Sequence, residues 1–340
     1  MFTVCSGFRL NKKHFLNKIF TEILQSKEMA APSRRCRIGW STTNKEGAAI
    51  LRQELNIWVV GGDLRQVKLA QLLTDDGHWV QTYAMERRPD PNTLPGSDTL
   101  RGIERAQCVI LPLPVTVDDG VLNAPLSDQK IPVKTVLDAL RPEQIVCAGR
   151  VSPELTAYAR SRGLNLQDYF AREELEIKNA VPTVEGAIQI AMEELPTTLF
   201  GARVLVIGFG RLGKLLAHRL KGLGARVTVS ARNYADLAWI ESYGYWSEHT
   251  DQLDGWLGGY QLVINTVPAR VLDGARLHDL DAGTLVIDLA SKPGGVDLEA
   301  AANLGVKVIW ALSLPGKVAP VTSGKIIRDT VYHILQEVAL

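Results

Sequence analysis

A glycine-rich turn over residues 208–213 has the spacing that most clearly predicts a binding chemistry. Its sequence follows the apolar run 203–207 and reads Gly208-Phe209-Gly210-Arg211-Leu212-Gly213, which is G-x-G-x-x-G. Gly208 permits a tight turn, Gly210 lets the backbone approach a pyrophosphate, and Gly213 lets the following helix pack closely. That helix would turn free N–H groups and its positive dipole end toward the phosphates. The turn therefore predicts a dinucleotide site; the alternative is an ordinary strand–turn–helix with chance glycines.

The end of the next predicted strand, residues 226–230, indicates which dinucleotide binds. An NAD site normally carries Asp or Glu about 20 residues after the glycines. This chain has Ser230, Ala231, Arg232 and Asn233 there. A carboxylate would repel a 2′-phosphate, whereas Arg232 could bind it bidentately and the Ser230 hydroxyl could donate to it. We therefore expect NADP; the alternative is that Arg232 is a solvated residue that begins the next helix.

Two later predicted strands end in residues that we expect at the reactive end of the cofactor. The strand 260–265 is followed by Thr266-Val267-Pro268, and the strand 284–289 by Ser291–Gly295, which includes Lys292. Ligands of open α/β sheets bind at the carboxyl ends of the strands. Thr266, Val267 and Pro268 should flank the nicotinamide ribose. Lys292 is a candidate active-site cation for a substrate carboxylate.

The N-terminal half alternates strands and helices without a G-x-G-x-x-G, so it is expected to bind substrate rather than cofactor. Its first predicted strand, 56–60, runs into Gly61-Gly62-Asp63 and a helix over 63–73. Gly62, Asp63 and Arg65 would offer helix N–H groups and a cation to an anionic small molecule. The alternative is a glycine turn that serves only backbone geometry.

A helix with Pro182 in its first turn and an apolar stripe over 185–195 is predicted to connect the two halves, separate from a helix over 169–179. On this segment Thr183 is a candidate substrate ligand. Glu185 is a candidate base, although an acidic residue at a helix start also simply favours the dipole. Residues 316–324 are expected to precede a final helix that packs back on the first domain.

The composition describes a soluble globular chain: 340 residues, 46% hydrophobic, with a formal net charge of +1. Nothing in this balance recruits nucleic acid or membrane. The four cysteines are scattered, so we expect reduced thiols in the cytoplasm and no metal site. The fold class is α/β, with two doubly wound parallel-sheet domains, the second a Rossmann domain, and a cleft between them. The predicted divisions are a mobile basic extension or misassigned start (1–54), a substrate domain (55–180), a connecting helix (181–198), an NADP domain (199–315) and a C-terminal helix (316–340).

Several runs of this chain together resemble the A subunit of dipicolinate synthase. They are Gly61-Gly62-Asp63-x-Arg65-Gln66, Leu111-Pro112-Leu113-Pro114, the segment 179–188, Asp288-Leu289-Ala290-Ser291-Lys292-Pro293-Gly294-Gly295 and the segment 314–320. The resemblance covers residue 55 to about residue 337 and leaves out the N-terminal extension.

The resemblance implies an NADP-linked oxidoreductase subunit in sporulating bacteria. With a flavoprotein B subunit, it would make pyridine-2,6-dicarboxylate from a hydroxytetrahydrodipicolinate or dihydrodipicolinate precursor. Two alternatives stay open: a D-2-hydroxyacid-dehydrogenase-like enzyme, and a non-catalytic cofactor-sensing or scaffold subunit, since fold alone does not separate them. A homo-oligomer is equally open.

Overall fold

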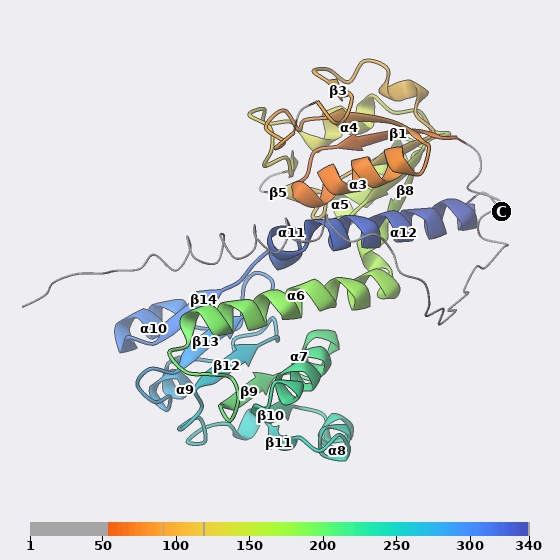
Figure 1. The fold of residues 1–340 in the computed structure, drawn as a ribbon. Helices are drawn as coiled ribbons and strands as arrows, with labels where there is room; N and C mark the ends of the chain where they lie inside the picture. The colour runs from red at the N-terminus through yellow and green to blue at the C-terminus, as the bar shows by residue number, and fades with distance from the viewer. Residues whose placement is uncertain (1–53, 91, 118–119, 339–340) are drawn as a thin grey trace, which may run out of the picture. The chain divides into compact units, whose positions relative to one another are not determined.

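The computed structural model describes residues 54–90, 92–117 and 120–338 (Figure 1). The predicted N-terminal extension lies outside these residues, apart from Glu54. No helix within the described ranges combines the length and the apolar character that crossing a membrane requires.

The first parallel sheet has the strand order β3-β2-β1-β4-β7-β8, and every neighbouring pair is parallel. The order reverses between β1 and β4, so this sheet is doubly wound. Near-continuous apolar residues bury its central strands on both faces, as a parallel sheet requires. The strands are β1 (Asn56–Val60), β2 (Trp79–Tyr83), β3 (Gly96–Ser97), β4 (Cys108–Ile110), β7 (Ile145–Ala148) and β8 (Asn165–Asp168), with helices α3 (Leu64–Asp75), α4 (Val133–Asp138) and α5 (Pro153–Ser161).

The second sheet repeats the plan with the order β11-β10-β9-β12-β13-β14, again parallel throughout. Its order reverses between β9 and β12. Two parallel-sheet α/β domains, the second of Rossmann type, confirm the predicted fold class. The strands are β9 (Arg203–Ile207), β10 (Arg226–Ala231), β11 (Trp246–His249), β12 (Leu262–Asn265), β13 (Leu285–Asp288) and β14 (Lys307–Trp310), with helices α7 (Arg211–Gly222), α8 (Tyr234–Ser242), α9 (Gly274–His278) and α10 (Leu298–Leu304).

A single helix, α6 (Glu173–Glu194), replaces the two helices that the sequence predicted around Pro182. An interior proline removes one helical hydrogen bond and costs about 3 kcal/mol. The helix continues because one face is buried on both sides of the proline, with Ala180, Val184 and Ala187 among its buried residues. It packs against α7 and against both C-terminal helices (Figure 1).

The C-terminal segment forms α11 (Leu314–Val318) and α12 (Pro320–Val338), so the final helix begins at Pro320, earlier than the sequence pattern indicated. Gly324 lies inside α12, and the absence of a side chain there lets α12 pass very close to α3. A Cβ atom at Gly324 would lie 2.9 Å from both the Arg65 carbonyl oxygen and the Leu69 nitrogen. Helix α12 thereby shares its apolar core with α3 and β1 (Figure 1).

Candidate functional site

The glycine turn between β9 and α7 has the close contacts that its sequence spacing predicts. Gly208 has a φ of +99°, and a Cβ there would lie 2.5 Å from Thr266 Oγ1. A Cβ at Gly213 would lie 2.0 Å from the Gly208 carbonyl oxygen. A Cβ at Gly210 would meet nothing within 4 Å, so space is open beside this residue at the start of α7. The first and third glycines are thus required by packing, and the second faces room for a ligand.

A cavity of about 610 Å³ opens beside this turn. Ligand pockets usually enclose roughly 300 to 1,000 Å³, so the space suits a small-molecule cofactor. It brings together most of the predicted cofactor residues: Gly208, Phe209, Gly210, Arg232, Thr266, Val267 and Pro268 all line it.

Four predicted cofactor residues lie outside the cavity wall. Arg211 pairs with Glu173 and Glu176 of α6, and Leu212 packs against the apolar core. Gly213 lies against the turn backbone, as described above. Ser230 is fully buried, and its Oγ accepts a hydrogen bond from Thr250 Oγ1 at 3.2 Å. The predicted donation from Ser230 to a 2′-phosphate does not fit this position, because the residue has no exposed surface and does not line the cavity.

Three arginines and two aspartates give the cavity its charges: Arg232, Arg270, Arg276, Asp236 and Asp251. Arg270 also pairs with Asp297 at 3.3 Å, and Arg276 with Asp254 at 2.7 Å. Sequence reasoning missed both of these arginines, although Arg270 follows Pro268 by only two residues.

His249 holds the backbone of Arg232. Its Nδ1 accepts from the Asp251 N–H at 3.3 Å, so Nε2 carries the proton and donates to the Arg232 carbonyl oxygen at 3.0 Å. The Arg232 side chain itself is exposed at the cavity wall. The sequence did not reveal His249, because it comes from β11, a polar strand that the apolar pattern did not predict.

Lys292 lies in a tight turn after β13. The Gly294 N–H donates to the Ser291 carbonyl oxygen at 2.9 Å, and the Lys292–Pro293 peptide bond is cis. Trp310 Nε1 holds the start of this turn by donating to the Ala290 carbonyl oxygen at 2.8 Å. The Lys292 side chain is exposed and forms no ion pair with any residue that the structure describes. It is therefore a free cation on a well-held turn.

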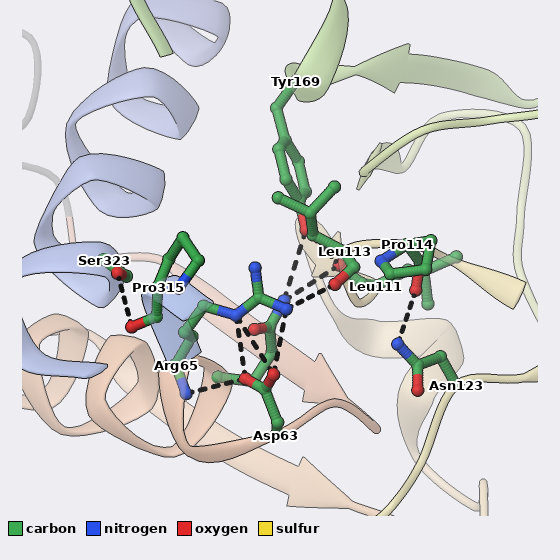
Figure 2. Close-up of polar contacts among 10 residues, drawn as sticks. Asp63, Arg65, Leu111, Leu113, Pro114, Asn123, Tyr169, Pro315 and Ser323 are labelled. Carbon is green, nitrogen blue, oxygen red and sulfur yellow. Dashed lines mark hydrogen bonds and ion pairs between the residues drawn. The ribbon is translucent and has the colours of Figure 1, made fainter. Parts of the chain in front are cut away.

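A second polar cluster lies at the carboxyl edge of the first sheet (Figure 2). Asp63 caps α3 by accepting from the Arg65 N–H at 2.9 Å. Its carboxylate also pairs with the Arg65 guanidinium, whose Nη2 lies 2.9 Å from Asp63 Oδ2 and donates to the Leu113 carbonyl oxygen at 2.6 Å. Arg65 is only 5% exposed. Helix α11 covers the pair, because a Cβ at Gly316 would lie 2.7 Å from Asp63 Oδ2.

These contacts differ from the sequence-based prediction of an open anion site. The Gly62 N–H already donates to the Asn123 carbonyl oxygen at 2.7 Å, so it is not free for a ligand. Arg65 uses two of its nitrogens for Asp63 and Leu113. Spacing alone could not reveal this, because the carbonyl oxygens of Leu113 and Asn123 come from loops that are distant in the sequence.

Tyr169 and Gln66 form the buried floor of the same cluster. Tyr169 Oη donates to the Leu111 carbonyl oxygen at 2.9 Å and accepts from Gln66 Nε2 at 3.2 Å. Burial raises the pKa of Tyr169 far above its usual value, so the phenol stays neutral. The cluster is a set of neutral and paired groups that fixes the loop Leu111–Leu113.

Thr183 and Glu185 both lie on α6. Thr183 Oγ1 donates to the Asn179 carbonyl oxygen one turn earlier, at 2.9 Å. Glu185 pairs with Arg219 of α7 at 3.5 Å and does not line the cavity. The contacts of these two residues are therefore those of a helix packed on its neighbour. Among the described residues no group of three or more His, Cys, Asp or Glu side chains is arranged to hold a metal ion.

Comparison with known proteins relates the chain to one family, the dipicolinate synthase A subunits. Residues 56–170 match the family model of the N-terminal domain of the dipicolinate synthase A subunit. The chain is 32% identical over 287 residues to the dipicolinate synthase A subunit of Bacillus subtilis (strain 168), covering 84% of this chain and 97% of that protein.

Solved structures agree with this match. The dipicolinate synthase A chain from Bacillus subtilis has a TM-score of 0.74 at 31% identity, covering 84% of this chain and 97% of that one. The dipicolinate synthase A subunit from Bacillus halodurans has a TM-score of 0.76 at 28% identity, covering 83% and 99%. A transhydrogenase from Sinorhizobium meliloti shares the fold alone, with a TM-score of 0.60 at 17% identity over 83% of this chain and 94% of that one.

Proposed function

Because this chain belongs to the family of dipicolinate synthase A subunits, we propose that it is the NADP-binding oxidoreductase subunit that forms pyridine-2,6-dicarboxylate during bacterial sporulation. The observation that carries the proposal is the G-x-G-x-x-G turn opening into the 610 Å³ cavity with three arginines. Membership of this family implies a second, partner subunit, for which we propose a flavoprotein.

The proposed reaction is an oxidation that makes a ring aromatic. Loss of water from a hydroxytetrahydrodipicolinate gives a dihydrodipicolinate. Transfer of one hydride from that ring to NADP⁺, with loss of one proton, gives dipicolinate and NADPH. The chain must therefore bind a dinucleotide, orient a dicarboxylate beside its nicotinamide and exclude water from the transferring hydride.

We propose NADP rather than NAD because of the charge at the far end of the cavity. Arg232 follows β10, at the place where NAD sites normally carry an acidic residue. Its guanidinium is exposed at the cavity wall, and His249 fixes its backbone. Arginine presents a planar fork that matches the oxygens of a phosphate. Ser230 has no role in this proposal, since it is buried beneath the wall.

For the substrate, the proposed cation is Lys292. It stands on the turn after β13 at the carboxyl edge of the sheet, where the reacting end of a dinucleotide lies in this fold. The Asp63–Arg65 pair instead holds the loop Leu111–Leu113 and the helix α11 in place. Glu185 and Thr183 are left out of the proposed chemistry because their own contacts account for them.

Turnover by the purified chain tests the proposal. The full chain is incubated with enzymatically generated hydroxytetrahydrodipicolinate and either NADP⁺ or NAD⁺, with and without the flavoprotein partner, while dipicolinate absorbance is followed. Formation of dipicolinate that depends on the chain and favours NADP⁺ is the expected result. Dinucleotide binding without turnover in every condition would reject the enzyme and favour a cofactor-sensing subunit.

A further inference from the structure

Asp288, the last residue of β13, is a carboxylate buried at the carboxyl edge of the second sheet, one strand in from the edge strand β14. It is 1% exposed and forms no ion pair with any residue in the described part of the chain. Its Oδ1 accepts from Asn265 Nδ2 at 2.8 Å and from the Ala290 N–H at 3.0 Å, and its Oδ2 accepts from the Gly295 N–H at 2.8 Å. All three partners are donors, and the carboxylate oxygens accept from each of them.

Two of these bonds hold the turn that carries Lys292. Ala290 and Gly295 stand at the two ends of that turn, and both of their N–H groups point to the same carboxylate. The turn is closed within itself by the bond from Gly294 to Ser291. Lys292 therefore projects from a loop whose two ends are fixed to one side chain.

The third hydrogen bond, from Asn265, connects Asp288 to the cavity wall. Asn265 holds Val267 on both sides: its Nδ2 donates to the Val267 carbonyl oxygen at 3.0 Å, and its Oδ1 accepts from the Val267 N–H at 3.1 Å. The other end of the wall, Val271, donates its N–H to the Gly295 carbonyl oxygen at 3.0 Å. Residues 267–271 line the cavity, and both of their ends are tied to groups that Asp288 holds.

Close packing leaves little freedom between these two branches. A Cβ at Gly295 would lie 2.0 Å from Asn265 Nδ2 and 2.7 Å from the Val267 carbonyl oxygen. A Cβ at Gly294 would lie 3.1 Å from Asp288 Oδ2. The wall and the turn can therefore shift only together.

We propose that Asp288 is a positioning residue that sets Lys292 relative to the nicotinamide end of the bound dinucleotide. It acts by fixing the cavity wall and the Lys292 turn to one carboxylate. This inference rests on the proposed function, because that function puts the nicotinamide beside the wall and the substrate at Lys292. Asp288 touches neither ligand in this scheme.

The test is Asp288→Asn, which keeps the size of the side chain but turns one acceptor into a donor facing an N–H group. Affinity is measured for two ligands: the dinucleotide that the wild type binds more tightly, and the adenosine half of that dinucleotide. The pair is NADP⁺ and adenosine 2′,5′-bisphosphate, or else NAD⁺ and AMP. We expect the dinucleotide to lose about tenfold or more in affinity, as charged hydrogen bonds are lost. The affinity for the adenosine half should stay unchanged. The fold decrease in kcat should be larger than the fold increase in the KM for substrate.

Asp168→Asn is the matched control. Asp168 also ends a strand and also accepts three hydrogen bonds, but in the first sheet. Its three donors are all backbone N–H groups, those of Arg150 at 3.0 Å, Val151 at 2.8 Å and Phe170 at 2.8 Å. It should lose comparable stability while both affinities stay unchanged. Equal losses for the dinucleotide and its adenosine half in Asp288→Asn, or no loss for either, would overturn the proposal.

Gly295→Ala provides a second test that leaves the carboxylate intact, should Asp288→Asn not fold. Its added methyl group would press the Lys292 turn away from Asn265, and the same selective loss of dinucleotide affinity is expected. Unchanged dinucleotide affinity in Gly295→Ala would contradict the coupling of wall and turn. A wild-type chain that binds the dinucleotide but makes no dipicolinate would overturn the proposed reaction alone, since the binding comparison does not depend on turnover.

Discussion

Replacing Arg232 by glutamine should weaken NADP⁺ binding and leave NAD⁺ binding nearly unchanged. NADP⁺ differs from NAD⁺ by the 2′-phosphate alone, and a charge-assisted hydrogen bond contributes about 1.5 to 3 kcal/mol. At about 1.4 kcal/mol for each factor of ten, the loss corresponds to a dissociation constant for NADP⁺ about 10- to 150-fold higher. The upper part of this range is expected, because Asp236 and Asp251 stay in the cavity wall and would repel the phosphate once the arginine is gone.

Calorimetric titration of both dinucleotides at one fixed ionic strength is the assay, because salt screens exposed charges. Arg226→Gln is the matched control: Arg226 is an exposed arginine at the opposite end of the same strand, β10, away from the cavity. This control should bind both dinucleotides as the wild type does. An unchanged NADP⁺ affinity in Arg232→Gln, or equal losses for NADP⁺ and NAD⁺, would refute the role assigned to Arg232.

Three further predictions concern the turn, the substrate and the effect of pH. Gly213→Ala should abolish dinucleotide binding in titration, because the methyl group would lie 2.0 Å from the Gly208 carbonyl oxygen. The control Gly222→Ala adds a methyl group where space is open, so this variant should bind normally. Binding by both variants would contradict the account of the turn. Lys292→Ala should raise the KM for substrate at least tenfold with little change in dinucleotide affinity, and equal losses would assign Lys292 to the cofactor. Burial lowers the pKa of His78 below its usual 6.5. The folded state therefore binds fewer protons than the unfolded state at this residue. The free energy of unfolding of the protein should fall as pH drops through and below about 6.5. Urea unfolding of His78→Gln should show a smaller loss of unfolding free energy over this pH range, because the contribution of His78 is absent. A loss as large as in the wild type would reject the assignment to His78.

The neutral state of His78 also follows from its hydrogen bonds. Its Nδ1 accepts from the Leu55 N–H at 3.3 Å, which leaves the proton on Nε2, 3.0 Å from Tyr332 Oη. Tyr332 in turn donates to Asp76 at 2.8 Å. A second proton on the imidazole would remove the acceptor for Leu55. The acid sensitivity would therefore arise where α12 packs against α3 and β2.

The strongly apolar strands and the glycine turn could be predicted from the sequence, because each is determined by local pattern. The strand β9 is recognised by its continuous apolar run, and Gly208 and Gly213 by close contacts within a few positions. Strands β8 and β11 were missed, since sequences such as Asn165–Asp168 are polar and half-buried at the edge of a sheet. Their pairing partners, and not their composition, make them strands.

Tertiary contacts decided the positions where sequence reasoning failed. Pro182 did not end α6, because packing on both sides of it outweighs the lost hydrogen bond. Arg65 is not open to a ligand, because the fold brings the Leu113 carbonyl oxygen and helix α11 to its pair with Asp63. Ser230 is buried against Thr250, a residue just after the end of another strand, and its position in the sequence did not show this contact. The network around Asp288 joins residues from two strands and could not be read from spacing.

A single-turnover measurement under anaerobic conditions, without any flavoprotein, tests the central claim most directly. The wild-type chain, in excess over NADP⁺, is mixed with hydroxytetrahydrodipicolinate, and NADPH and dipicolinate are quantified together. Hydride transfer on this chain predicts one NADPH for each dipicolinate formed, with both appearing at the same rate. Dipicolinate formed without NADPH would contradict hydride transfer to a dinucleotide held at the Gly208–Gly213 turn.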